Sequence, residues 1–208
     1  MKKIVNSIGI VALLLISAAV HAQKGNVKAD VNYNYSLPMG NFKNNIISNG
    51  SPRGGNVSIM YSLSNKLALG GVVGYQDYYQ KYPRAVYQTG DHESTSAVLS
   101  NSLQSTPLMA KLAYTPLGSS ASPIQPYISA GAGFSFVSFK QYLGEFGGTD
   151  NSISFAAQAG AGVLIPFGKL SQAGVRLGAD YSYLPYNKNN MGNLTSLDLH
   201  AGVYFPLR

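Results

Sequence analysis

The chain has 208 residues, a formal net charge of +7 and no cysteine, which excludes a disulfide framework, a thiolate metal site and a lipid anchor on cysteine. Only 11% of its residues are charged, against about 25% in soluble globular domains, whereas tyrosine (15) and glycine (23) are abundant. This composition suits a protein whose outside faces lipid, and the scattered basic residues argue against nucleic acid as a partner.

The first residues have the pattern of a secretory signal. Lys2 and Lys3 precede an apolar run from Ile8 to Val20, and small residues occupy the cleavage positions up to Ala22. A transmembrane anchor is the alternative, but the run is shorter than the ~20 residues that cross a bilayer. We therefore predict a cleaved signal peptide over residues 1–22 and one domain over residues 23–208.

The mature chain alternates apolar and polar residues with a period of two, which indicates strands with two different faces. No segment beyond the signal has a helical period. Pro107 leaves the start of the fourth strand undefined, because proline cannot donate to a sheet ladder. We expect eight strands, within residues 27–36, 56–63, 67–76, 108–114, 128–136, 154–163, 175–182 and 197–205.

The expected connections alternate in length. Short ones fall at 64–66, 115–125 and 166–172, and long ones at 37–54, 78–96, 140–151 and 184–195. Short turns at one end and long loops at the other are typical of an outer-membrane barrel with both termini in the periplasm. The fold class is therefore all-β, an eight-stranded antiparallel transmembrane β-barrel with short periplasmic turns and long extracellular loops.

Soluble β-sandwiches and lipocalin-like barrels alternate too, but two features favour the membrane. The polar faces carry the glycines and ionisable groups, which suits a narrow lumen. Aromatic residues also concentrate near the strand ends, as in interfacial girdles: Tyr33, Tyr35, Tyr61, Tyr75, Tyr78, Tyr114, Phe136, Tyr181, Tyr183 and Phe205.

Three stretches carry a family resemblance: Tyr35–Phe42 (YSLPMGNF), Gln125–Gly133 (QPYISAGAG) and Leu177–Tyr183 (LGADYSY). With them, the chain resembles the small eight-stranded "porin family" or outer membrane β-barrel domain proteins of Bacteroidetes-type bacteria. The resemblance implies a bacterial outer-membrane location and contact with the insertion machinery. Family members commonly end on an aromatic residue, whereas here Pro206-Leu207-Arg208 follow Phe205.

Ionisable residues on the polar faces are the first candidate site. Most come from strands one, seven and eight, which become neighbours when the barrel closes, and a charge in a narrow lumen must be paired or hydrated. We expect them to form an ion-pair plug, with a gate or a lumenal binding site as the alternative. The candidates are Asp30, Lys111, Arg176, Asp180, Asp198 and His200.

Catalysis and metal binding find little support. Asp198 and His200 share one face of a strand, as an acid–base pair would, but that face is the lumen and no His-x-Ser sequence follows. His92 lies between Asp91 and Glu93, and consecutive loop residues make poor metal ligands. We predict no enzyme, metal or cofactor.

A tyrosine-rich loop with interspersed basic residues is the second candidate site, because tyrosine and arginine are enriched at binding hot spots. The alternative is that its tyrosines belong to the outer girdle and its basic groups meet lipopolysaccharide phosphates. The candidates are Tyr79, Lys81, Tyr82, Arg84 and Tyr87.

The sequence thus predicts a non-enzymatic surface or structural protein of the outer membrane. Its expected partners are membrane lipid, lipopolysaccharide, the insertion machinery and an extracellular ligand or protein. A narrow passive channel is the alternative, and an enzyme acting on envelope lipid is third.

Overall fold

The computed structural model describes residues 26–88, 94–118, 122–144, 146–168, 171–186 and 192–207. The predicted signal peptide lies outside the described residues, so its cleavage remains a prediction. No described helix is long and apolar enough to cross a membrane.

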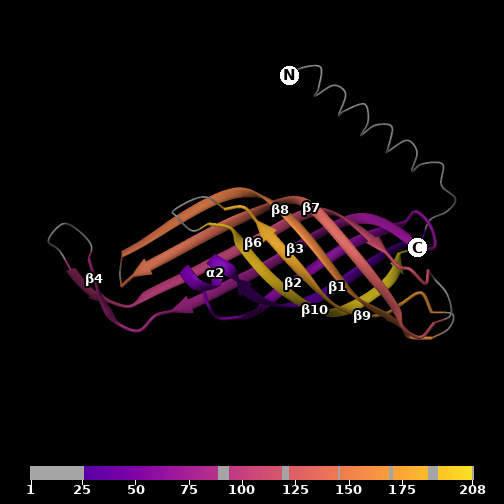
Figure 1. Cartoon of the computed structure of the whole chain (residues 1–208), viewed down its shortest axis with the longest axis horizontal. Coiled ribbons are helices and arrows are strands. Elements are labelled where there is room, and N and C mark those ends of the chain that lie inside the picture. Colours follow the sequence, from indigo (N-terminus) through magenta and orange to yellow (C-terminus); the bar gives the residue numbers. More distant parts are fainter. Residues whose placement is uncertain are drawn as a thin grey trace, which may run out of the picture.

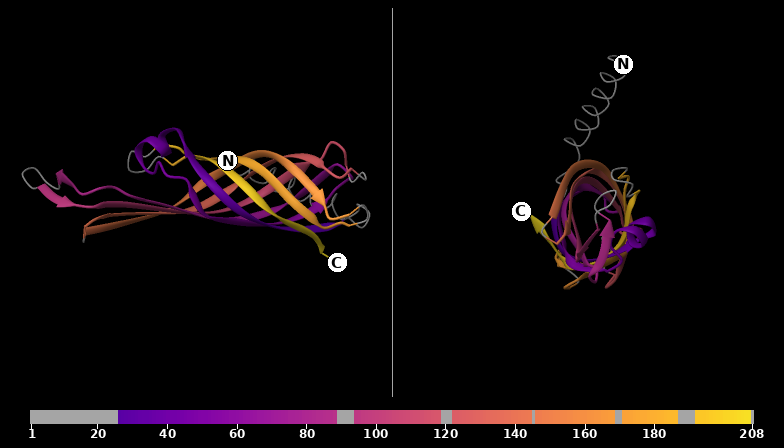
Figure 2. Two further views of the ribbon diagram at one scale, coloured as in Figure 1. Left: turned by 90° about the horizontal axis from the view of Figure 1, so that it is seen from below. Right: turned by 90° about the vertical axis from the view of Figure 1, so that its left-hand side faces the viewer.

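Eight of the strands form one closed barrel (Figures 1 and 2). The barrel strands are β1 (Val27–Met39), β2 (Ser51–Ser62), β3 (Leu67–Lys81), β6 (Leu99–Tyr114), β7 (Gln125–Leu143), β8 (Phe146–Pro166), β9 (Gly174–Leu184) and β10 (Leu194–Leu207). Each pairs antiparallel with its neighbours, and β1 closes the ring by pairing with both β2 and β10. The predicted eight-stranded antiparallel barrel is confirmed.

The barrel is apolar outside and polar inside, the reverse of a soluble protein. On β7, Ile128 and Phe134 point outward with 56% and 62% of their surface exposed, whereas Ser129 and Ser135, which directly follow them, are buried. The same alternation places Asp30 and Asp180 inside with 4% and 1% exposed. Lipid is the environment in which this distribution is stable, because an apolar exterior of this extent would be costly in water.

The two ends of the barrel differ. The ends of β2, β6 and β8 lie with the start of β1 and the end of β10, and we call this the turn end. At the opposite end, the loop end, a short helix α2 (Gly40–Asn45) stands at the rim and a hairpin of β4 (Ala85–Gln88) and β5 (Ser94–Ala97) projects furthest (Figure 1).

Three connections at the loop end differ from expectation. In segment 37–54, β1 continues to Met39, α2 follows and β2 begins at Ser51. Segment 140–151, expected as a long loop, is mostly strand, because β7 and β8 pair up to Leu143 and Phe146. Part of segment 78–96 is also strand, because β3 continues to Lys81 and β4 and β5 follow. The ends of β3, β6, β7 and β8 therefore continue as a four-stranded ribbon beyond the ring of eight strands (Figure 2).

Pro107 lies inside β6, which begins at Leu99. Its side chain is accommodated by Gly74 on the neighbouring strand, where an added Cβ would lie 3.0 Å from the proline Cγ. The register of β3 with β6 is interrupted there, between the Val73–Leu108 and Gln76–Ser105 pairs. This is the consequence of the missing backbone donor, and it explains why the proline blurred the strand boundary in the sequence.

Candidate functional site

An ion pair crosses the lumen between β1 and β9. The Arg176 guanidinium on β9 donates from Nη1 to Oδ2 of Asp30 on β1, at 2.8 Å, and Ser58 donates to the same oxygen at 2.7 Å. Both charged side chains are about 95% buried. A buried pair of this kind is stable only when its remaining hydrogen-bonding groups are also satisfied, so the surrounding contacts matter as much as the pair.

Tyr127 joins this ion pair to a second one. Arg176 stacks on the Tyr127 ring at 4.2 Å from its centroid and donates from Nε to its hydroxyl at 2.9 Å. The same hydroxyl lies 2.7 Å from Nε2 of His200, and the other ring nitrogen, Nδ1, is 3.3 Å from Asp180. Lys111 reaches Asp180 from the opposite wall at 3.4 Å.

Glycine makes room for this network. A Cβ added at Gly178 would lie 2.7 Å from both His200 Nε2 and the Tyr127 hydroxyl, and one at Gly160 would collide with the Asp180 carboxylate. The ionic side chains occupy the space that these two glycines leave empty. The glycines therefore allow the lumen to be filled and do not open it.

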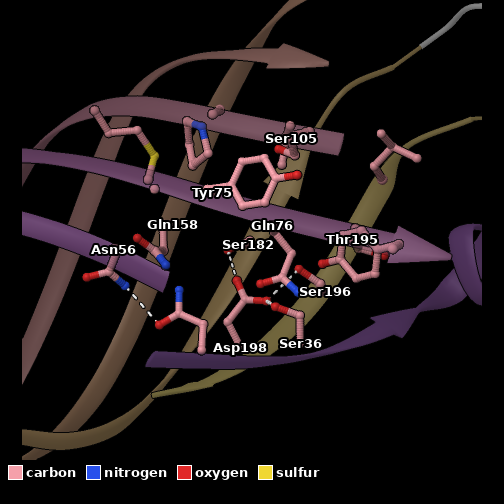
Figure 3. Close-up of a pocket in the computed structure, with 18 of the residues that line it drawn as sticks. Ser36, Asn56, Tyr75, Gln76, Ser105, Gln158, Ser182, Thr195, Ser196 and Asp198 are labelled. Atoms are coloured by element: carbon pink, nitrogen blue, oxygen red, sulfur yellow. Dashed lines mark hydrogen bonds between the residues drawn. The ribbon is translucent and has the colours of Figure 1, made fainter. Parts of the chain in front are cut away.

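Asp198 lies outside this network, although it was predicted to belong to it. Its carboxylate accepts hydrogen bonds from Ser36 and Ser182 at 2.5 Å each and from Ser196 at 3.0 Å (Figure 3). Asp198 is two residues nearer the loop end than His200 on β10, which puts it at another height of the barrel. The structure therefore brings together five of the six predicted lumen residues: Asp30, Lys111, Arg176, Asp180 and His200.

The loop-end mouth is filled by apolar side chains instead of charges. Phe42 of α2 reaches inward and meets the Tyr78 ring edge-on, with 5.0 Å between centroids. The apolar cap, as we call this cluster, consists of Phe42, Ile46, Ile47, Tyr78, Leu103, Val137, Phe139, Tyr186 and Leu194. Tyr78 was expected in the outer girdle and instead points into the barrel, where it is 4% exposed. Burial also raises the pKa of Tyr186 above its ordinary value, which keeps this phenol neutral.

Among the described residues, the lumen has a cavity on each side of the ionic network. The one towards the loop end, shown in Figure 3, has a volume of about 60 Å³ and lies between Asp198 and its serines and the apolar cap. The one at the turn end has about 140 Å³ and is lined by Lys28, Lys66 and Arg176, among others. A single water needs roughly 10–15 Å³ of such space, so both cavities hold water-sized molecules, and the network separates them.

The five predicted loop residues do not form one cluster. Tyr79 and Lys81 are exposed at the end of β3, Arg84 is exposed between β3 and β4, and Tyr87 is half-buried in β4. Tyr82 differs from the others because its hydroxyl donates to the carbonyl of Ile46 at 2.9 Å, fixing the loop that follows α2. The predicted weak metal candidate at 91–93 lies outside the described residues, and the described part of the chain has no group of three metal-binding side chains.

Sequence reasoning missed Tyr127 and the apolar cap. Tyr127 shares the polar face of β7 with Ser129 and Ser135, so the alternation contained a signal for it. The cap depends on α2, which has six residues and is too short for a helical period to be read.

A closed sheet with an apolar exterior and an ionic interior defines a membrane-spanning β-barrel. The model of the outer membrane protein beta-barrel domain family matches residues 8–205, and the chain belongs to this family, which places it in the outer membrane.

Solved structures agree with the fold. Neisserial surface protein A is 19% identical with a TM-score of 0.52, over 89% of this chain and 98% of that one. A major outer membrane protein from Thermus thermophilus is 15% identical with a TM-score of 0.55, over 87% and 99%. No curated protein sequence matches the chain.

Proposed function

We propose that this barrel is a non-enzymatic protein with a structural or surface-interaction role, and that its lumen does not conduct. The observation that supports this is closure at two levels: the Arg176–Asp30 pair with its network in the lumen, and the apolar cap at the loop end. Eight strands enclose only enough space for side chains or one small ligand, and here side chains take most of it. Asp198 and His200 have different partners, so their spacing produces no acid–base pair.

The loop end supplies the surface for contacts. Outer-membrane barrels have short turns on the periplasmic side, so the loop end faces out of the cell in our proposal. The projecting ribbon and the β4–β5 hairpin expose Val86 (70%), Tyr142 (44%) and Phe146 (73%). Large exposed side chains outside the membrane band, tyrosine above all, are typical of binding surfaces.

Basic groups border the same surface. Lys81 is exposed at the end of β3, level with Tyr142 of β7 through Ser100 of β6, and Arg84 is exposed just before β4. Their charge suits the phosphates of lipopolysaccharide, while the exposed aromatic side chains of the ribbon suit a protein or another extracellular ligand. β9 pairs with β8 only from Ala157 onward. The part of β8 before Ala157, which belongs to the ribbon, therefore has no pairing with β9.

Conductance in planar bilayers tests the closed lumen. We expect the wild-type protein to give no current steps at physiological salt. Steady single-channel steps would instead support the alternative, a narrow passive channel, for which the two water-sized cavities are the favourable observation. The same preparation should change its electrophoretic mobility on boiling, which verifies that a folded barrel was inserted.

Orientation is testable because the chain has no cysteine. Val86→Cys places one thiol on the β4–β5 hairpin, and Asn65→Cys places one in an exposed turn at the opposite end. A membrane-impermeant maleimide applied to intact cells should label the first and spare the second. Labelling of residue 65 alone would reverse the orientation and remove the surface role.

A further inference from the structure

The cavity at the turn end has an unusual lining for a closed lumen. It has a volume of about 140 Å³, enough for several waters, and opens between the start of β1 and the turn that joins β2 to β3. Besides its charged residues it is lined by hydroxyl and amide side chains, including Ser62, Ser64, Asn65 and Gln125. Met60, Leu67 and Leu164 add apolar wall, so the polar groups of the cavity are concentrated on a few side chains.

Its charges do not balance. Lys28, Lys66 and Arg176 line it against a single carboxylate, Asp30, which leaves a formal charge of +2. Asp30 is already occupied by Arg176 and Ser58. In the described part of the chain neither lysine has a carboxylate within 4.0 Å. Two cations at one mouth without counter-charges repel each other unless an anion lies between them.

The geometry keeps these donors at the mouth. Lys28 Nζ lies 5.5 Å from the centroid of the buried Tyr204 ring, which holds the ammonium group beside the cavity. Lys66 is exposed in the turn at the rim. Further in, Arg176 has a second terminal nitrogen, Nη2, that is buried and has no hydrogen-bond partner among the described residues.

We propose that this mouth binds a phosphate group, held between Lys28 and Lys66 with Arg176 behind it. A phosphate monoester or inorganic phosphate carries a charge between about −1.5 and −2 at pH 7, which matches the excess positive charge, whereas a single carboxylate would leave part of it. Its oxygens accept from ammonium groups and from the hydroxyls of the turn at the same time. Two sources offer this chemistry, a soluble phosphate and the phosphate monoester headgroup of a membrane lipid such as phosphatidic acid.

Urea unfolding of the full barrel in a non-ionic detergent without phosphate tests the site. Inorganic phosphate should raise the unfolding midpoint, and sodium chloride at equal ionic strength should not, which separates binding from charge screening. Lys28→Gln and Lys66→Gln should each weaken phosphate binding about tenfold or more, the loss expected for one charge-assisted hydrogen bond. Lys81→Gln, an equal change of charge at the loop end, is the control and should bind as the wild type does.

The second arm uses vesicles. If inorganic phosphate does not stabilise the protein but phosphatidic acid vesicles do, relative to phosphatidylcholine vesicles, and Lys28→Gln and Lys66→Gln remove this difference, the phosphate belongs to a lipid headgroup and the proposal stands. If neither source stabilises the protein, or if Lys81→Gln reduces the effect as much as the other two, the proposal is wrong. Change of mobility on boiling shows in every case that the variant has folded.

Discussion

Replacing Arg176 by methionine separates a buried ion pair from an exposed one in the same chain. The substitution keeps the length of the side chain but removes the 2.8 Å bond to Asp30, the 2.9 Å bond to Tyr127 and the stacking on its ring. Because Asp30 is 4% exposed, its buried charge is then left without its ion-pair partner. Removing one partner of a buried pair costs about 3–5 kcal/mol.

The matched control is Arg53→Met. Arg53 also pairs with an aspartate, Asp77 at 3.4 Å, but its side chain is 65% exposed at the loop end. An exposed pair is screened by water and salt and contributes about 0–1 kcal/mol. The two variants remove the same functional group and differ mainly in burial, so the difference between them measures the effect of the lumen.

The assay is reversible urea unfolding in lipid vesicles, followed by far-ultraviolet circular dichroism because the chain has no tryptophan. A double-mutant cycle with Asp30→Asn isolates the pair: the double variant should lose less than the two single variants together. If Arg176→Met costs no more than Arg53→Met, or if the two lumen substitutions are additive, the pair does not stabilise the barrel and the argument for a structural plug fails.

Three further predictions use the same unfolding assay. Gly178→Ala should lower the free energy of unfolding by about 1–3 kcal/mol, because the added Cβ meets the ionic network. Gly148→Ala is the control and should stay within about 0.5 kcal/mol, since nothing lies within 4 Å of a Cβ there. Equal effects would contradict close packing in the lumen. Phe42→Ala should cost about 3 kcal/mol by emptying the centre of the apolar cap, yet leave planar bilayers silent because the ionic network stays in place. Phe134→Arg, on the lipid-facing side of β7, should lower the free energy of unfolding by about 2–4 kcal/mol. Ser138→Arg lies further along the same side and should lower it by about 0–1 kcal/mol. Similar costs would mean that β7 is still in the membrane at Ser138.

Strand faces were readable from the sequence because alternation reports directly which side a residue occupies. That was enough to place Asp30, Arg176 and Asp180 inside and to predict that they meet. Height along the barrel was not readable, because it depends on strand tilt and stagger, which a pattern of period two does not contain. Asp198 was therefore grouped with residues on its own face and proved to lie at another level, among serines.

The loops were misread for a different physical reason. From Ile128 to Phe136 the apolar residues of β7 face outward, but Val137 and Phe139 are apolar and buried inside, so the hydrophobic pattern shifts by one residue while the backbone continues as a strand. β6 shows the same shift, because Leu103 is buried inside the barrel and Leu108 is exposed on the outside. A reading that expects apolar residues on one face throughout ends the strand where the shift occurs.

This shift follows from the change of solvent along the strand. Within the membrane the barrel faces lipid, and its narrow interior collects the polar groups. Where β6 and β7 leave the lipid their outer face meets water, so the apolar side chains turn inward and pack on Phe42 of α2 as they would in a soluble protein. The barrel thus has an ionic interior within the membrane and an apolar interior above it. An ion that crossed the barrel would have to displace the charge-balanced ionic network and then pass the apolar cap. These two barriers are of opposite kind, so a substitution that lowers one leaves the other in place.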